Sequence, residues 1–132
     1  MIRWHHDDPF DVDPSDCLGA VAILGQVGRL EDTCVNLDTV FYGLLRLLQS
    51  LRSETPAEID LVEEPDLLRG ERSDHGVTLL YGQQSVELHS MEEFERALRT
   101  SVAEFLDSLP SEPPDWDTYA ELRRFVGRED SE

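Results

Sequence analysis

The longest regular pattern of apolar positions lies between Asn36 and Arg52. Apolar side chains recur there at alternating spacings of four and three residues, which places them on one stripe of an α-helix: Leu37, Phe41, Leu44, Leu48 and Leu51. Asn36 is a favourable N-cap, and Asp38 lies in the first turn, at the positive end of the helix dipole. Further leucines widen the stripe. The pattern therefore predicts a helix over 36–52 that a sheet and a neighbouring helix must cover.

Short apolar or alternating runs predict the strands. A continuous apolar run that ends at a glycine predicts a buried strand in the centre of the sheet, and three alternating runs predict half-buried strands. The four strands are expected over 18–25, 57–63, 76–82 and 85–90. The last two form a hairpin with a turn at Gly82 to Ser85, in which we expect Leu79 to face Leu88 and Tyr81 to face Val86.

Three further segments give weaker patterns. Met1–Trp4 is compatible with a short strand at the start of a loop-rich segment over 1–16. Leu67 and Leu68 suggest a ragged strand at the edge of the sheet. Residues 26–35 fit either a hairpin partner of the first buried strand or a loop, and the sequence does not decide between them.

Two more helices are predicted after the last strand. Ser90 and Glu93 form a capping box ahead of an apolar stripe, which predicts a helix over 92–109 that Pro110 ends. A shorter helix begins near Asp115, and we expect a disordered tail over 127–132. The order of elements predicts one α+β domain over 1–132, with a single antiparallel or mixed sheet of four to five strands and helices packed on one face.

The composition is acidic but otherwise that of a folded protein. The chain has 132 residues, of which 39% are hydrophobic, enough for one core without disulfides or metal. Its 29 acidic and 11 basic residues give a net charge of −18, which disfavours binding to nucleic acid or to an anionic membrane and favours a basic partner. All of the basic residues are arginine, so a salt-adapted organism with a GC-rich genome is a rival explanation. There is no apolar run of membrane-spanning length and no signal-peptide pattern, and we expect a cytoplasmic protein.

Residues with metal-binding or redox chemistry are few. His5, His6, Asp7 and Asp8 are adjacent in one extended segment, so they cannot all point at one ion, and we predict no metal site and no cofactor. A hairpin turning at Gly25-Gln26 would bring Cys17 opposite Cys34, but a reducing cytoplasm favours two free thiols.

The sequence contains none of the common catalytic motifs. It lacks the signatures of serine hydrolases, phosphate-binding loops, dinucleotide-binding folds, zinc proteases and dithiol redox proteins. Paired carboxylates are too abundant in an acidic chain to indicate acid–base catalysis. We therefore predict no catalytic residue, although a small enzyme without a recognisable motif stays an alternative.

Strand alternation instead predicts a binding surface. If the apolar strand residues face the helices, acidic side chains share the opposite face of the sheet, where they form either a solvated surface or a docking face for a basic protein. The predicted partner-binding residues on this face and beside it are Glu58, Asp60, Glu63, Glu64, Asp66, Glu71, Asp74, Glu87 and His89.

The pattern of residues 30–109 resembles that of small acidic immunity proteins of bacterial polymorphic-toxin systems. The segments that carry the resemblance are LEDTCVNLDTVFYGLLRLLQSL, YGQQSVELHS and MEEFERALRTSVAEFLDSL. It implies a non-enzymatic inhibitor that binds a cognate toxin, often a basic nuclease, and it assigns no individual binding residue. A protein of a salt-adapted cell whose charge reflects its habitat would show the same pattern.

Overall fold

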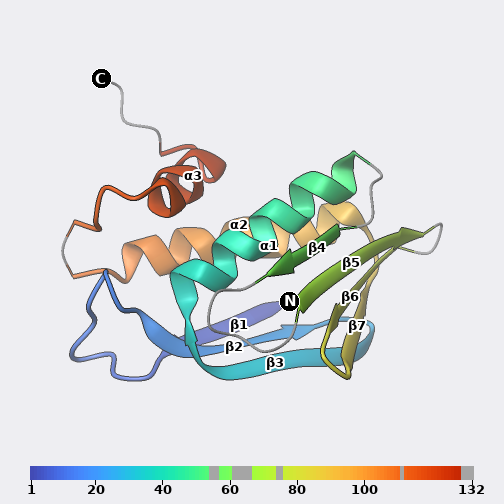
Figure 1. The fold of residues 1–132 in the computed structure, drawn as a ribbon, viewed down its shortest axis with the longest axis horizontal. Coiled ribbons are helices and arrows are strands. Elements are labelled where there is room, and N and C mark those ends of the chain that lie inside the picture. Colours follow the sequence, from blue (N-terminus) through green and yellow to red (C-terminus); the bar gives the residue numbers. More distant parts are fainter. Residues whose placement is uncertain (54–56, 61–66, 74–75, 111, 129–132) are drawn as a thin grey trace.

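The chain folds into one antiparallel sheet covered by helices (Figure 1). A computed structural model describes residues 1–53, 57–60, 67–73, 76–110 and 112–128. Within these ranges the sheet has seven strands in the order β1-β2-β3-β7-β6-β5-β4. The elements are β1 (Ile2–His6), β2 (Leu18–Leu24), β3 (Val27–Asn36), α1 (Leu37–Arg52), β4 (Ala57–Asp60), β5 (Leu67–Ser73), β6 (Gly76–Tyr81), β7 (Gln84–Leu88), α2 (Met91–Asp107) and α3 (Asp117–Phe125). The predicted α+β class is confirmed, and the sheet is larger than the expected four or five strands.

Helix α1 lies at the centre of the core, as its sequence predicts. Leu37, Phe41, Leu47, Leu48 and Leu51 are completely buried. Asn36 holds the extended backbone of an N-cap, although no hydrogen bond from its side chain caps the helix. Helices α1 and α2 pack on one face of the sheet, and α3 packs against both of them rather than against the strands (Figure 1).

The sheet contains two strands, β1 and β3, that the sequence pattern suggested but did not decide. β3 takes up residues 27–36 as the hairpin partner of β2, although its burial does not alternate regularly. Two backbone irregularities explain the poor pattern, because Gly28 and Cys34 both have positive φ, 76° and 56°. β1 reaches His6, so both histidines lie on a strand and not in the loop. They point to opposite faces, His5 exposed and His6 buried.

Two predictions about strand position were wrong. β5 was expected at an edge because of its charged residues, yet it pairs with β4 on one side and with β6 on the other. Two of its charged side chains, Arg69 and Glu71, lie on the face away from the helices, where a strand inside the sheet tolerates them. The third, Arg72, donates to the carbonyl of Leu51 near the end of α1 at 3.3 Å. β2 is second from the edge rather than central, and β7 takes the middle position.

The register of the last hairpin also differs from the prediction. Leu79 pairs with Val86 and Tyr81 pairs with Gln84, so each partner is shifted by two residues from the expected one. The turn is shorter than expected, with Gly82 at a φ of 61° as its first residue. A shift of two residues keeps every side chain on its predicted face. The buried set of the hairpin is therefore unchanged.

The two remaining helices follow the predicted boundaries closely. Ser90 caps α2, because its hydroxyl accepts the backbone N–H of Glu93 at 3.1 Å. The Glu93 carboxylate accepts the N–H of His89 at 2.9 Å, one residue earlier than in a standard capping box. Gly127 and Arg128 were expected in a disordered tail. Instead their N–H groups bond the carbonyls of Arg124 and Arg123 and end α3 in a Schellman motif.

Both cysteines are free, one buried and one exposed. Gly25 and Gln26 do lie between β2 and β3, but the last pair of this hairpin is Leu24 with Arg29, so the turn is wider than the predicted two residues. Leu18 pairs with Asn36, and Cys17 and Cys34 are not opposite each other. The register is already offset at the turn, where Leu24 pairs with Arg29, and the irregularity between Gly19 and Val21 offsets it by one residue more.

Candidate functional site

The predicted partner-binding residues are spread over the second half of the sheet. Glu71 on β5 and Glu87 on β7 are exposed and lie on either side of Thr78 in the strand register. His89 follows β7 and is also exposed. In the register of β4, Glu58 pairs with Arg69 and Asp60 pairs with Leu67. The remaining predicted residues, Glu63, Glu64, Asp66 and Asp74, lie outside the described residues.

This open face of the sheet carries both signs of charge. Arg3, Arg29 and Arg69 are exposed on it, between acidic and small apolar side chains. Arg29 forms an ion pair with Glu31 at 2.6 Å. The alternation that placed acidic residues on this face is correct for Glu87, and Glu71, which was expected beside the face, is exposed on it as well. The arginines reduce the negative field that a cationic partner would meet.

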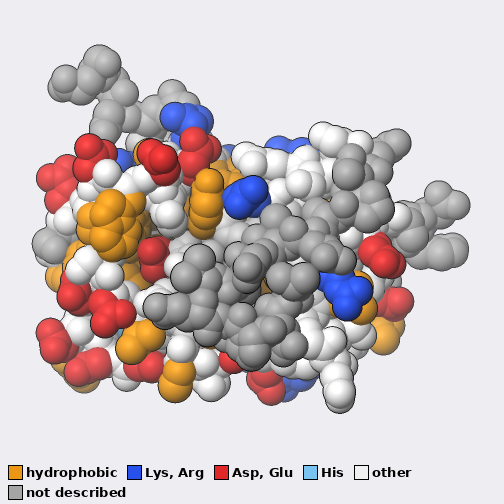
Figure 2. Space-filling model, in the orientation of Figure 1, with side chains coloured by type: hydrophobic (Ala, Val, Ile, Leu, Met, Phe, Trp, Pro, Cys, Tyr) orange, Lys and Arg blue, Asp and Glu red, His pale blue; other side chains and the backbone are white. Residues whose placement is uncertain are grey.

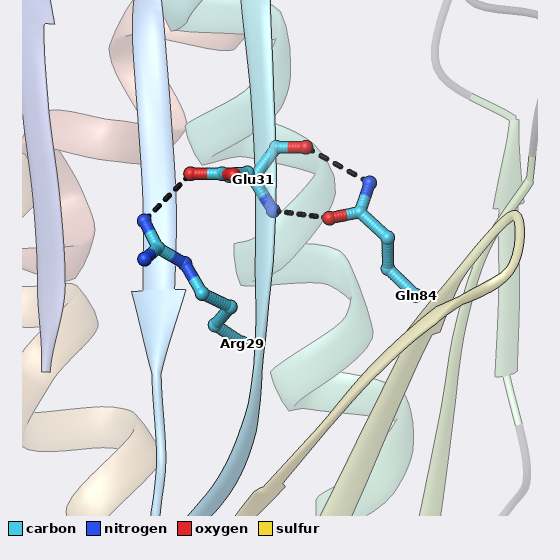
Figure 3. A network of polar contacts seen from close by, with 3 residues as sticks. All are labelled: Arg29, Glu31 and Gln84. Carbon is cyan, nitrogen blue, oxygen red and sulfur yellow. Dashed lines mark hydrogen bonds and ion pairs between the residues drawn. The ribbon is translucent and has the colours of Figure 1, made fainter.

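One polar network, between β3 and β7, has a structural role. β3 and β7 pair through their backbones only at Val27 and Gly28, and beyond that point the two strands diverge. There the Gln84 side-chain amide accepts the N–H of Glu31 at 2.8 Å and donates to its carbonyl at 2.9 Å (Figure 3). The Gln84 amide therefore replaces a backbone peptide group of a paired strand and holds the two halves of the sheet together.

A more uniform acidic surface lies at the loop between β1 and β2. Residues 4–28 contain no arginine, and five aspartates fall within them. Figure 2 shows acidic side chains gathered over this loop, at the left of the view. The loop forms a pocket of about 340 Å³, here called the acidic pocket, whose lining includes His6, Val12, Cys17, Leu18 and all five aspartates, Asp7, Asp8, Asp11, Asp13 and Asp16.

The aspartates of the acidic pocket have no cationic partner in the described part of the chain. The ion pairs found there join Arg29, Arg52, Arg99, Arg124 and Arg128 to carboxylates on β3 and the helices. None involves a pocket aspartate. The pocket is therefore a concave surface with several carboxylates that no arginine of the described chain neutralises. A cation from outside can relieve the repulsion between these carboxylates.

Local hydrogen bonds give the loop a defined shape. The Asp13 carboxylate accepts the backbone N–H of Ser15 at 2.9 Å and its hydroxyl at 2.7 Å. Both bonds lower the pKa of Asp13, and the bond from the Ser15 hydroxyl has the larger effect. The Asp13 carbonyl in turn accepts the N–H of Asp16 at 2.9 Å and closes a turn.

The base of the pocket holds a buried histidine and a neighbouring serine. His6 Nε2 lies 2.7 Å from Ser108 Oγ, and that hydroxyl lies 2.6 Å from the carbonyl oxygen of Phe105. A carbonyl can only accept, so the single hydroxyl proton goes to Phe105 and His6 donates from Nε2. The histidine therefore does not act as a base toward Ser108. Burial, followed by the charge of His5, lowers the pKa of His6.

Cys17 and Tyr119 lie beneath the loop and are both buried. The Cys17 thiol donates to the carbonyl of Asp13 at 3.1 Å, and its sulfur lies 3.3 Å from the Tyr119 hydroxyl. Burial raises the pKa of Cys17 to about 11, so at neutral pH it is a thiol and a poor nucleophile.

Burial also raises the pKa of Asp38 in the first turn of α1. Among the described residues, no group of three or more histidine, cysteine, aspartate or glutamate side chains is arranged to hold a metal ion.

From its sequence, this loop was expected to be only an acidic, solvated connection. Its sequence signal is slight: five aspartates fall within residues 7–16 with no arginine among them, but residues 73–95 and 100–122 lack arginine over nearly as long a stretch as 4–28. The contact with Tyr119 could not have been anticipated, because it joins residues more than a hundred positions apart.

Comparisons with known proteins give no family for this chain. No family model, curated protein or solved structure matches it significantly. No helix in the described residues is long and apolar enough to cross a membrane.

Proposed function

We propose that this chain is a non-catalytic binding protein that recognises a basic protein, as an inhibitor or immunity-type partner would. One observation carries the proposal: five aspartates line a pocket of about 340 Å³, and none of them is paired with an arginine of the described chain. The net charge of −18 supports it, because a long-range field of this sign attracts cationic proteins and repels nucleic acid.

The chemistry of the pocket suits a guanidinium or ammonium group of the partner. Carboxylates grouped on one concave surface repel each other, and a cation placed between them relieves that repulsion while it gains charge-assisted hydrogen bonds. Arginine is favoured over lysine, since its planar fork can bond two carboxylate oxygens at once. Val12 and Leu18 add apolar surface to the lining, against which the aliphatic part of such a side chain can pack.

The proposal is tested with three sets of variants that each remove three carboxylates. The pocket set is D7N, D8N and D11N. The sheet set is E58Q, E71Q and E87Q, which tests the surface predicted from strand alternation. The control set is E92Q, E104Q and E112Q, all exposed and outside both surfaces. Because all three sets change the net charge equally, differences in binding report position rather than total charge.

Binding is measured by fluorescence anisotropy at low and at physiological ionic strength. The probes are an oligo-arginine peptide and an inactive form of any basic protein encoded beside this chain. We expect the pocket set to raise Kd about tenfold or more at low salt and the control set only about two- to threefold. Equal effects of the pocket and control sets would show that only net charge matters. If the sheet set has the largest effect, the partner surface is the open face. An inhibitor further predicts that co-production with the active neighbouring protein restores cell growth.

A further inference from the structure

The acidic pocket is built on a loop whose two ends are held by residues from the far end of the chain. The loop leaves β1 at His6, whose ring donates to Ser108 at the C-cap of α2. The His6 ring also contacts that of Phe105, with ring centroids 6.0 Å apart. The start of the loop is thereby fixed to the end of α2.

The second attachment is Tyr119 of α3. Its hydroxyl donates to the carbonyl of Pro14 at 2.5 Å and lies 3.3 Å from the sulfur of Cys17. The tyrosine is completely buried, and its ring stacks on Phe105 with an interplanar angle of 11°. The hydroxyl therefore reaches the loop from a rigid part of the core.

The tyrosine hydroxyl serves as a donor toward the loop. It carries one proton, and the Pro14 carbonyl can only accept, so the proton is committed to that bond. The Cys17 thiol is left to donate to Asp13. Burial, followed by its contact with Cys17, raises the pKa of Tyr119, so the hydroxyl keeps its proton throughout the physiological pH range.

The geometry points to Tyr119 and Ser108 as positioning residues of the acidic pocket, which hold the aspartate loop at both ends in the shape that receives the partner's cation. This inference rests on the proposed function for its last step, the cation, and on the hydrogen bonds alone for the rest. A loop held in place before binding loses less conformational entropy when the partner arrives.

The test variant is Tyr119→Phe, which removes the hydroxyl and keeps the buried ring. Tyr81→Phe is the matched control, because it removes a tyrosine hydroxyl that donates to Asp32 at 2.7 Å, away from the loop. Ser108→Ala releases the other end of the loop. Hydrogen exchange of the free protein is followed at the amides of Ser15, Asp16 and Leu18 for the tyrosine variants, and at Asp7 for Ser108→Ala.

We expect Tyr119→Phe to speed exchange at the three loop amides about two- to tenfold, as the loss of one hydrogen bond implies, and Tyr81→Phe to leave them unchanged. Affinity for the oligo-arginine peptide should fall in Tyr119→Phe and in Ser108→Ala. Unchanged exchange in both of these variants would overturn the inference. Faster exchange with unchanged affinity would also overturn it, because loop order would then not serve binding. The aspartate variants test the proposed function separately.

Discussion

The Gln84 side chain is expected to stabilise the sheet far more than an exposed glutamine normally does. Its amide makes two hydrogen bonds to the backbone of Glu31, at 2.8 and 2.9 Å, where β3 and β7 have separated. A hydrogen bond contributes about 0.5 to 1.5 kcal/mol net, and water can replace part of it at this exposed position. Gln84→Ala should therefore lower the free energy of unfolding by about 1 to 2 kcal/mol.

The measurement is urea unfolding of Gln84→Ala beside Gln83→Ala. Gln83 is the neighbouring residue in the hairpin turn, has the same side chain and is exposed. Its substitution should change stability by less than about 0.5 kcal/mol. Hydrogen exchange at the Glu31 amide should rise only in Gln84→Ala. Equal stabilities of the two variants, with the Glu31 amide still protected, would show that the backbone pairs at Val27 and Gly28 suffice to join the two halves.

Three further predictions follow from the core, the buried carboxylate and the net charge. Leu48→Ala should lower the free energy of unfolding by about 2 to 5 kcal/mol in urea unfolding, because Leu48 is completely buried against the sheet and its loss leaves a cavity. Burial raises the pKa of Asp38 above its value in the unfolded chain, so ionisation of this carboxylate lowers the free energy of unfolding as the pH rises through that pKa. Asp38→Asn should therefore raise the urea midpoint at neutral pH. This increase in the midpoint should vanish below the ordinary aspartate pKa, where the carboxyl is neutral in both states. Circular dichroism in dilute buffer should show a folded protein, whereas structure that returns only in molar salt would favour salt adaptation as the source of the charge.

The elements with strong periodicity were predictable from sequence because their burial is decided locally. The stripe of α1 and the alternation of β6 and β7 follow from side-chain geometry, which is the same in any fold that covers one face of a helix or strand. The sequence could not distinguish β3 from a loop, because two residues with positive φ, Gly28 and Cys34, break the alternation of its side chains. The position of β5 inside the sheet is a property of strand order, which alternation within one strand cannot reveal.

The candidate site was less predictable, for a related reason. Alternation correctly placed Glu87 on the open face, but it says nothing of the arginines that other strands bring to the same face. The acidic pocket depends on a loop without periodicity, closed by a hydrogen bond from Tyr119 to Pro14 across the length of the chain. Local sequence could show only that the loop lacks arginine. The loop becomes a pocket because α3 packs against α1 and α2 and brings the buried hydroxyl of Tyr119 to it. The last helix therefore shapes the acidic pocket, although its contacts are with the other two helices.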